Sequence, residues 1–319
     1  MNFCNEEERV EAVIFAAPGA RSKLVVPSPV DKGKELTISV SAFQTLAEQL
    51  HAMRGLDLLG YKDRYARRRL SVRLRARKCA SLEDYLELLE REPEEWDRLV
   101  AALSINVSNF YRNPETFETI RTRLLPEIIQ WRQQHGQPRL KLWSAGCADG
   151  DEAYSLAILL REHFPGPLAI MAVSILGTDI DEDSLARARA GSYPESRLAD
   201  LPPGLREKHF SPRGEEWVVR RRVAALVRFQ RQDLLCDPAP EDLDLVVCRN
   251  VLIYLSREEQ EGILDRFSIS LRPGGYLVLG KTETLIGRLR RALVPVIPRE
   301  RIYQKPGVAE APSRQEVDG

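Results

Sequence analysis

Cysteine and histidine are scarce in this sequence, and neither residue is grouped. The five cysteines, Cys4, Cys79, Cys147, Cys236 and Cys248, show no Cys-x-x-Cys spacing, and the four histidines are scattered. Disulfide frameworks and zinc sites need clustered residues, so we predict a reduced, cytoplasmic protein without a metal ion. Cys147 has no histidine placed near it in the sequence, which makes it a poor candidate for a catalytic thiol.

Long apolar runs and an excess of charge of one sign are absent as well. Lys and Arg number 47, Asp and Glu also number 47, and the net charge is zero. No apolar run approaches the roughly 18 residues of a membrane-spanning helix, and the N-terminus lacks the basic start and apolar core of a signal peptide. We therefore expect no membrane insertion, and the overall charge favours no nucleic acid partner.

One stretch that is present, residues 141–156 (KLWSAGCADGDEAYSL), organises the rest of the chain. Residues 140–143 are short and apolar, as in a buried parallel strand, and a helical pattern begins at Ala153. Gly146 and Gly150 lie between them, and glycines let a backbone turn sharply and approach a ligand closely. The order predicts a strand, a ligand-binding loop and a helix; an ordinary strand–helix turn is the alternative.

The charge of this loop indicates which ligand it suits. Asp149, Asp151 and Glu152 would repel a nucleotide pyrophosphate, and the loop has neither the G-x-G-x-x-G spacing nor a P-loop lysine. A cationic group, such as the sulfonium or ammonium of S-adenosylmethionine (SAM), fits these carboxylates better. The alternative is that the acids only cap the following helix, where they suit the helix dipole.

From residue 140 onward, strand and helix patterns alternate, which predicts an α/β fold with helices on both faces of a parallel sheet. Asp179 follows the second strand, residues 172–178, about 30 residues after the glycine loop, where an acid suits ribose hydroxyls. Loops at the carboxyl ends of parallel strands meet at one edge, which predicts a nucleoside-type site but not its chemistry. These loops are residues 144–152, 179–181, 233–234 and 249–254.

The remaining strand patterns complete the sheet. An antiparallel pair is expected to close it, and residues 217–222 are expected to pair with residues 226–230, the second of which enters the main sheet. The further expected strands are residues 244–248 and 276–280, and the closing pair is residues 293–298 and 301–304.

Residues 41–104 have the pattern of a small helical domain. Its second helix carries nine basic residues against one acid, Asp63, and in a neutral protein this is a strong local field. The field predicts an acidic partner, either a nucleic acid or an acidic protein helix, although a solvated face is the alternative. Few aromatic residues interleave, so stacking on single-stranded bases is not supported. The expected helices are residues 41–53, 61–78, 81–90 and 94–104.

These patterns divide the chain into four parts. Residues 1–40 form an extension without an assigned function, and residues 41–112 form the helical domain with a polar linker. Residues 113–305 form the α/β domain. The last part, residues 306–319, is expected to be disordered.

Six blocks of this sequence resemble the CheR-type chemotaxis receptor methyltransferases, SAM-dependent enzymes that esterify receptor glutamates. The match covers residues 41–305, and six blocks in the family's order are far more specific than any one motif. The resemblance implies an all-α N-terminal domain before a class I SAM-dependent methyltransferase domain, which is a Rossmann-like sheet with an antiparallel closing strand. It also implies a small inserted β-subdomain at about residues 205–225. The blocks are INVSNFYRNPETF, KLWSAGCADGDEAYSL, LGTDIDEDSLARARAGSY, RFQRQDLL, CRNVLIYLS and LRPGGYLVLGKTETL.

The resemblance also implies roles for individual residues. Glu152 would bind the methionyl amino end of SAM, Asp179 would hold the ribose hydroxyls, and Asp233 with Leu234 would border the adenine. Arg112 and Tyr254 would lie near the transferred methyl group as the catalytic residues. The implied cofactor-binding set is Asn106, Ser108, Arg112, Gly146, Glu152, Asp179, Asp233, Leu234, Arg249 and Asn250.

The expected partner on this resemblance is the acidic, glutamate-bearing helix of a chemotaxis receptor, which the basic helix would meet through Arg67, Arg68 and Arg73. We expect SAM as cofactor, S-adenosylhomocysteine as product and a monomeric enzyme. The β-subdomain is shorter than in members that bind a receptor C-terminal pentapeptide, so we predict that this tethering is absent. The loop ADGDEAYS stands where the family more often has STGEEPYS, which changes its charge and reach at Asp149 and Asp151.

Two other functions remain open at this point. One is a SAM-dependent methyltransferase of another acceptor, either RNA or a small molecule. The sequence has no N/D-P-P-Y/F tetrapeptide of amino-methylating enzymes and no catalytic cysteine motif, which disfavours that function. The other is a non-catalytic SAM-binding regulator, which the unusual acidic loop would suit.

Overall fold

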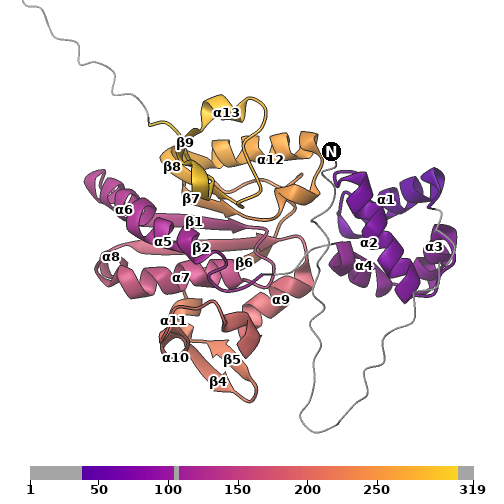
Figure 1. The fold of residues 1–319 in the computed structure, drawn as a ribbon, viewed down its shortest axis with the longest axis horizontal. Helices are drawn as coiled ribbons and strands as arrows, with labels where there is room; N and C mark the ends of the chain where they lie inside the picture. The colour runs from indigo at the N-terminus through magenta and orange to yellow at the C-terminus, as the bar shows by residue number, and fades with distance from the viewer. Residues whose placement is uncertain (1–37, 104–107, 308–319) are drawn as a thin grey trace, which may run out of the picture. The chain divides into compact units, whose positions relative to one another are not determined.

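The computed structural model describes residues 38–103 and 108–307, so almost all of the expected N-terminal extension and C-terminal tail lie outside the described residues. The described chain contains a group of helices followed by an α/β domain (Figure 1). None of the helices within these residues is long and apolar enough to cross a membrane.

The four helices expected in the N-terminal part are all present. Gly55 ends the first helix in the left-handed region, with φ of 67°, and its N–H donates to His51 O at 2.8 Å. Ser81 and Asp84 form a capping box at the start of the third helix. Buried leucines and aromatic residues hold the four helices together in one apolar cluster. The helices are α1 (Val40–Arg54), α2 (Asp63–Ala76), α3 (Leu82–Arg91) and α4 (Glu95–Leu103).

The α/β domain contains a seven-stranded sheet with the order β6-β2-β1-β7-β8-β10-β9. Strands β6, β2, β1, β7 and β8 pair in parallel, and β10 pairs antiparallel with both β8 and β9. The expected parallel sheet with an antiparallel closing pair is therefore confirmed. The strands are β1 (Arg139–Ala145), β2 (Ala172–Asp179), β6 (Val227–Arg231), β7 (Leu243–Cys248), β8 (Leu271–Leu279), β9 (Val294–Ile297) and β10 (Ile302–Gln304).

Helices cover both faces of this sheet, as Figure 1 shows with α7 and α12 on opposite sides. The alternation of side chains along β1 explains this, because Leu142 joins the apolar cluster of one face and Trp143 joins the cluster of the other. The strand is buried on both sides, as its apolar sequence predicted. The covering helices are α6 (Leu125–Gln134), α7 (Asp151–His163), α9 (Glu182–Ala190), α12 (Arg257–Ser270) and the short α5 (Pro114–Thr119), α8 (Pro165–Ile170) and α13 (Leu289–Ala292).

One π-helical turn, Ile120–Leu124, joins α5 to α6. The Leu125 N–H donates to Ile120 O, five residues back, which is the π-helical pattern. Pro126 gives the physical reason, since a proline lacks the N–H of a normal helical bond and clashes with the carbonyl four residues before it.

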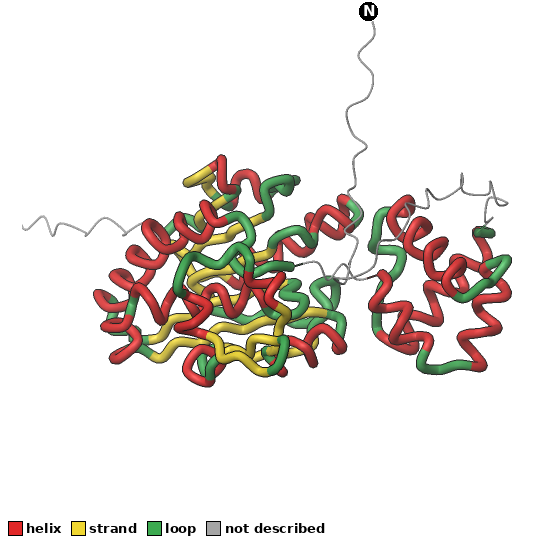
Figure 2. The backbone as a smooth tube through the Cα atoms, turned by 60° about the horizontal axis from the view of Figure 1, so that its bottom comes forward, coloured by secondary structure: helices red, strands yellow, loops and turns green. Residues whose placement is uncertain are grey.

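The inserted β-subdomain is a three-stranded sheet of order β3-β5-β4, separate from the seven-stranded sheet. Figure 1 labels its strands β4 and β5, and Figure 2 draws all the strands of the described chain in yellow. Its strands are β3 (Ser192–Pro194), β4 (Phe210–Arg213) and β5 (Glu216–Val219), so it begins before the expected residues 205–225. The expected pairing of residues 217–222 with 226–230 is wrong. β5 pairs with β3 and β4, whereas the short helix α11 (Arg221–Ala224) redirects the chain so that β6 pairs with β2.

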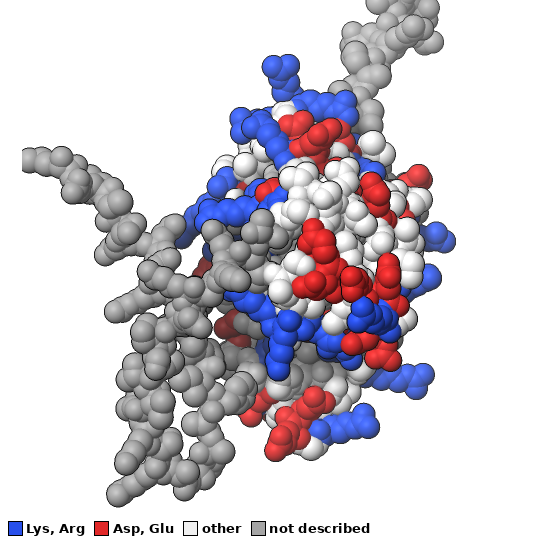
Figure 3. All heavy atoms as spheres, turned by 90° about the vertical axis from the view of Figure 1, so that its right-hand side faces the viewer, with Lys and Arg blue, Asp and Glu red and all other residues white. Residues whose placement is uncertain are grey.

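Charge on the described surface is mixed rather than of one sign. On the face drawn in Figure 3, Lys and Arg side chains (blue) lie between Asp and Glu side chains (red) and an uncharged area (white). This agrees with the zero net charge of the sequence. Any electrostatic docking surface must therefore be local, such as one face of a single helix.

Candidate active site

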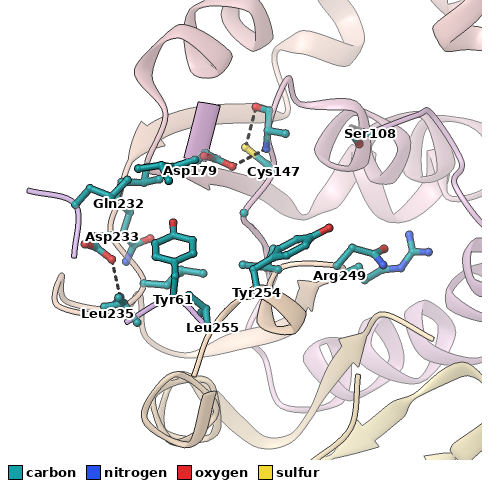
Figure 4. Close-up of a pocket in the computed structure, with 18 of the residues that line it drawn as sticks. Tyr61, Ser108, Cys147, Asp179, Gln232, Asp233, Leu235, Arg249, Tyr254 and Leu255 are labelled. Atoms are coloured by element: carbon teal, nitrogen blue, oxygen red, sulfur yellow. Dashed lines mark hydrogen bonds between the residues drawn. The ribbon is translucent and has the colours of Figure 1, made fainter. Parts of the chain in front are cut away.

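A pocket lies at the carboxyl ends of β1, β2 and β7 and is drawn in Figure 4. The predicted site residues lie together in this pocket, because the loops at the carboxyl ends of parallel strands meet at one edge of the sheet. Asn106 lies outside the described residues, so its expected contact is not described. The other predicted cofactor-binding and catalytic residues all line the pocket: Ser108, Arg112, Gly146, Glu152, Asp179, Asp233, Leu234, Arg249, Asn250 and Tyr254.

The glycine loop after β1 is shaped by backbone hydrogen bonds to the end of β2. The N–H groups of Gly146 and Cys147 donate to Thr178 O at 2.8 and 2.9 Å. Gly146 has φ of 72°, and a Cβ there would collide with the Val251 side chain. A glycine is therefore needed for both the backbone conformation and the close approach of the Val251 loop.

Glu152 lies in the first turn of α7 and is the only loop acid that reaches the pocket among the residues described. Its Oε1 accepts a hydrogen bond from Ser144 Oγ at 2.8 Å, and its Oε2 lies 3.5 Å from Arg249 Nη1. Burial raises the pKa of Glu152, while the Arg249 charge and the Ser144 hydrogen bond oppose that shift. The carboxylate is thus oriented in the pocket with room for a cationic partner.

Asp179, at the end of β2, faces the same pocket. One carboxylate oxygen accepts from Ala148 N at 2.8 Å and the other from Asp181 N at 3.0 Å. Burial raises the pKa of Asp179 to about 6, against the lowering effect of these backbone hydrogen bonds. The side chain is held in place by two backbone donors and can accept further hydrogen bonds from a ligand.

Asp149 and Asp151 do not line the pocket, contrary to the expectation that the loop acids would face a cationic ligand. Arg197 binds both of them, with its Nη1 3.2 Å from Asp149 Oδ2 and its Nε 3.0 Å from Asp151 Oδ1. Arg187 Nε also donates to Asp149 Oδ1, at 3.0 Å. The two charges are therefore neutralised inside the protein, and Glu152 alone gives this loop its negative charge in the pocket.

The loop after β7 carries Arg249, Asn250 and Tyr254 and is held by Glu283, which sequence reasoning missed. The buried Glu283 carboxylate accepts from the N–H groups of Asn250, Val251 and Gly280 at 3.0, 2.9 and 2.7 Å. Asn250 has φ of 62°, a conformation that a non-glycine residue adopts at some cost. An acid within the quoted block LRPGGYLVLGKTETL was the available signal, but nothing local in the sequence assigned its partners.

Arg112 also lies beside residues with unusual backbone conformations. Tyr111 and Asn113, on either side of it, have φ of 52° and 60°. The Tyr111 N–H donates to the buried Ser155 Oγ at 3.0 Å, and Asn113 Oδ1 accepts from Arg249 Nη2 at 2.5 Å. Strained backbone at pocket residues is typical of a site that fixes a side chain, here Arg112.

Tyr254 faces the pocket near Arg112. Burial raises the pKa of Tyr254, and the positive charge of Arg112 partly opposes this shift. The phenol is therefore a hydrogen-bond donor at neutral pH. Arg112 and Tyr254 together offer donors to one anionic group at this end of the pocket.

Three buried polar atoms of the pocket have no hydrogen-bond partner within the described part of the chain. They are Gln232 Oε1, Asp233 Oδ2 and Arg249 Nε. Buried polar atoms are normally paired, so these three indicate that a polar ligand completes the pocket. Gln232 was not predicted from the sequence. A nucleoside that carries an amino acid group offers partners of both kinds, and SAM is such a molecule.

The predicted docking residues of α2 have different environments. Arg73 binds the buried Glu95 through two hydrogen bonds of 2.6 and 2.7 Å, and Arg67 donates to Asp63 Oδ1 at 2.7 Å and to Ile38 O at 3.1 Å. Arg68 is exposed. Two of the three predicted guanidinium groups are thus engaged within the helical domain, and Arg68 alone is presented to solvent.

Comparison with known proteins agrees with this site. A family described as "CheR methyltransferase, SAM binding domain" matches residues 106–294, and one described as "CheR methyltransferase, all-alpha domain" matches residues 41–104. The chain is 34% identical to chemotaxis protein methyltransferase 2 of Pseudomonas aeruginosa over 269 residues, which cover 82% of this chain and 92% of that protein. It is 31% identical to the chemotaxis protein methyltransferase of Listeria monocytogenes over 232 residues, with coverage of 73% and 86%.

A further relative is much longer than this chain. It is an uncharacterized 104.1 kDa protein of Rhodobacter capsulatus, 33% identical over 276 residues, and the match covers 86% of this chain but only 29% of that protein. Both domains of the chain are matched in order, and the pocket lies within the SAM-binding match apart from Leu56, Asp57, Tyr61 and Leu103. The chain belongs to the CheR methyltransferase family, in which an all-α domain precedes a class I SAM-binding methyltransferase domain.

Proposed function

We propose that this chain is a protein-glutamate O-methyltransferase, which transfers the methyl group of SAM to glutamate side chains on the helices of chemotaxis receptors. The observation that carries the proposal is the arrangement of the pocket. Arg112 and Tyr254 lie near one another, and the same pocket contains Asp179 and Asp233, which can bind a nucleoside. The relatives named as chemotaxis protein methyltransferases, at 31% and 34% identity, support the receptor as substrate.

The cofactor contacts in this proposal follow the chemistry of each pocket side chain. Glu152 is assigned to the ammonium of SAM, and Asp179 to the ribose hydroxyls as their hydrogen-bond acceptor. Asp233 and Leu234 are assigned to the adenine, and Arg249 to the carboxylate, since its Nε has no partner within the described residues. S-adenosylhomocysteine, which differs only in the transferred methyl and its charge, would leave from the same contacts.

The acceptor needs no general base, because a glutamate carboxylate is already ionised at neutral pH. When bound, SAM supplies a methyl group on a cationic sulfur; a carboxylate lone pair forms the new C–O bond while the C–S bond breaks and its electron pair returns to sulfur. The chain's task is to align and desolvate the acceptor. Arg112 and Tyr254 do this by donating hydrogen bonds to the carboxylate, which offsets part of its lost hydration.

The exposed basic face of α2 is assigned to the receptor helix. Arg64, Arg68 and Arg75 are exposed, and their spacing of four and seven residues places them on one side of the helix. This face takes the place of the engaged Arg67 and Arg73 in the docking surface. We keep two further predictions, that the short β-subdomain binds no receptor pentapeptide and that the enzyme is a monomer.

The test is transfer of labelled methyl from SAM to receptor-containing membranes, followed by mild alkali. Release of the label as volatile methanol is expected, since a carboxyl methyl ester hydrolyses under these conditions. Label that stays on the acceptor would instead indicate N- or C-methylation of another target. The Arg112→Ala variant serves as the matched negative control in the same membranes.

A further outcome would separate the remaining function. No transfer to any receptor, together with tight SAM binding measured separately, would support a non-catalytic SAM-binding regulator. Receptors from several sources, each with exposed glutamates on cytoplasmic helices, would therefore be used before that conclusion is drawn.

A further inference from the structure

One wall of the pocket comes from the helical domain and not from the SAM-binding match. The turn between α1 and α2 contributes Leu56, Asp57 and Tyr61 to the lining. Asp57 Oδ1 accepts from the N–H groups of Leu59 and Gly60 at 2.9 and 3.3 Å, which shapes this turn. The family matches divide the chain at residues 104 and 106, so these lining residues lie in the all-α part.

This turn is fixed to the loop that carries Tyr254 by backbone hydrogen bonds. Tyr61 forms an isolated antiparallel bridge with Leu255, the Ser256 N–H donates to Gly60 O at 2.8 Å, and the Lys62 N–H donates to Tyr254 O at 2.9 Å. Three residues on each side of the contact, Gly60–Lys62 and Tyr254–Ser256, are therefore held in register, and the turn is a fixed wall of the pocket.

A second connection joins the turn to the sheet. Arg231 Nη2, at the end of β6, donates to Arg54 O at 2.6 Å. The Tyr61 side chain packs against the apolar cluster of the helical domain and also against one cluster of the α/β domain. The side chain is thus placed by both domains and closes the space between them on the pocket side.

Within the pocket, Tyr61 lies beside Asp179 and Asp233, the residues assigned to the ribose and the adenine. Figure 4 shows its ring between Asp233 and Tyr254, with Asp179 drawn above it. Burial raises the pKa of Tyr61, and the nearby Asp233 and Asp179 carboxylates raise it further, which places the phenol near both. The Tyr61 ring therefore lies in the part of the pocket where the adenosine of SAM is expected to bind.

We propose that Tyr61 of the helical domain is a cofactor-binding residue, whose ring covers the adenosine part of SAM and completes the pocket. An aromatic ring is suited to a purine, since every base has a flat face that stacks on it, and the phenol needs no specific partner for this contact. The inference rests on SAM binding by the family and not on the receptor as acceptor. Adenosine affinity is thereby shared between the two domains.

The test measures the dissociation constants of S-adenosylhomocysteine and 5′-methylthioadenosine, which share adenosine but differ in the amino acid group. Tyr61→Leu keeps apolar volume and removes the aromatic face, so it is expected to weaken both ligands by about tenfold or more. Tyr61→Phe keeps the ring and is expected to stay within about threefold of the parent, because the phenol contributes little. Equal affinities of the Leu variant and the parent would overturn the proposal.

A control distinguishes this contact from a general loss of the site. Glu152→Gln is expected to weaken S-adenosylhomocysteine while leaving 5′-methylthioadenosine unchanged, since only the first ligand carries the ammonium. A purely structural role of Tyr61 would lower the melting temperature of Tyr61→Leu and leave both affinities intact well below that temperature. That pattern would also overturn the proposal, and receptor methylation is not needed for either measurement.

Discussion

The guanidinium of Arg197 holds the carboxylate of Asp151 through two hydrogen bonds, of 3.0 Å from Nε and 2.5 Å from Nη2. The Asp151 side chain is fully buried, whereas that of Arg197 is 21% exposed. Burial raises the pKa of Asp151, and the Arg197 charge opposes this. Arg197 thus supplies the positive charge that the buried Asp151 requires beside the glycine loop.

Removing Arg197 should destabilise the protein and weaken SAM binding together. Arg197→Gln leaves Asp151 buried without its cation, which costs on the order of 2 kcal/mol of unfolding free energy, less than for a fully buried pair because Arg197 is partly exposed. The loop that carries Glu152 then loses its support. Chemical denaturation and a SAM titration measure the two effects.

The matched control is the double variant Arg197→Gln/Asp151→Asn. It removes the uncompensated charge, so we expect it to recover most of the lost unfolding free energy. If the double variant is no more stable than Arg197→Gln, charge compensation is not the role of this pair.

Cofactor binding should weaken as the pH falls through about 6, because burial raises the pKa of Asp179 to about 6. The ionised carboxylate is the acceptor assigned to the ribose, and the protonated form accumulates below that pH. At pH 5 the association constant of 5′-methylthioadenosine should be about tenfold lower than at pH 7. This ligand has no amino acid group, so Glu152 does not contribute to the change.

The Asp179→Asn variant checks the assignment. It cannot titrate, so its affinity should be weaker than that of the parent at pH 7 and flat between pH 5 and 7. Asp179 also affects stability. Between pH 3.8 and about 6 its carboxyl is protonated in the folded state but ionised in the unfolded chain. The contribution of Asp179 to the unfolding free energy therefore falls as the pH rises through that window. If the affinity of Asp179→Asn for 5′-methylthioadenosine still changed between pH 5 and 7, the assignment of Asp179 to the ribose would be wrong.

The loop that carries Tyr254 should lose its alignment when Glu283 is changed. Glu283→Gln keeps the volume of the side chain but replaces one of the two accepting oxygens by an NH2 group, so either the hydrogen bond from Val251 or those from Asn250 and Gly280 are lost. A displacement of about 1 Å at the reacting groups is enough for a loss of about 10²-fold in turnover. Single-turnover methyl transfer at saturating SAM measures this.

The KM for the receptor separates alignment from docking in that experiment. We expect it to change little, because Glu283 lies on the pocket side and not on α2. An increase confined to KM, with turnover unchanged, would refute a role of Glu283 in positioning the loop.

Turnover should also depend on Arg112. Arg112→Ala removes a charge-assisted donor from the acceptor carboxylate, and we expect a loss of about 10²–10³-fold in turnover with the fold intact. Arg112→Lys retains the charge without the planar geometry and should recover part of that loss. Circular dichroism and SAM affinity serve as controls, and a variant with normal turnover would remove Arg112 from the catalytic residues.

Local patterns in the sequence predicted the elements and most of the pocket. The strand ends at Asp179, Asp233 and Arg249 could be read from short apolar runs followed by polar residues, and all three line the pocket. Strand-end positions are local information, and the parallel topology brings them together without further signals. The four helices of the N-terminal part could be predicted for the same reason, from spacing and caps.

Partners that are distant in the chain could not be predicted in this way. Asp151 is paired with Arg197 of the β-subdomain, and Glu283 binds the loop at Asn250, across separations of 46 and 33 residues. Such pairs have no periodic pattern, because each side chain alone reads as a solvated charge. For the same reason, the sequence did not reveal that Arg73 is paired with Glu95, which is buried on another helix.

The last prediction concerns the exposed basic face of α2, formed by Arg64, Arg68 and Arg75. The triple variant to alanine removes three charges that have no ion pair within the described residues, so we expect the fold and the SAM affinity to be unchanged. The KM for the receptor should rise, and its dependence on salt should weaken, because exposed charges act through a screened field. Initial rates at several ionic strengths measure both.

The matched control removes the same charge elsewhere, in the triple variant Arg221→Ala/Arg291→Ala/Arg299→Ala. These three residues are exposed and lie outside α2. If net charge alone attracted the receptor, both triple variants would raise KM equally. If α2 is the docking element, only the α2 variant raises the KM. Its three like charges lie on one helical face and act within a Debye length, about 8–10 Å, of the bound receptor helix.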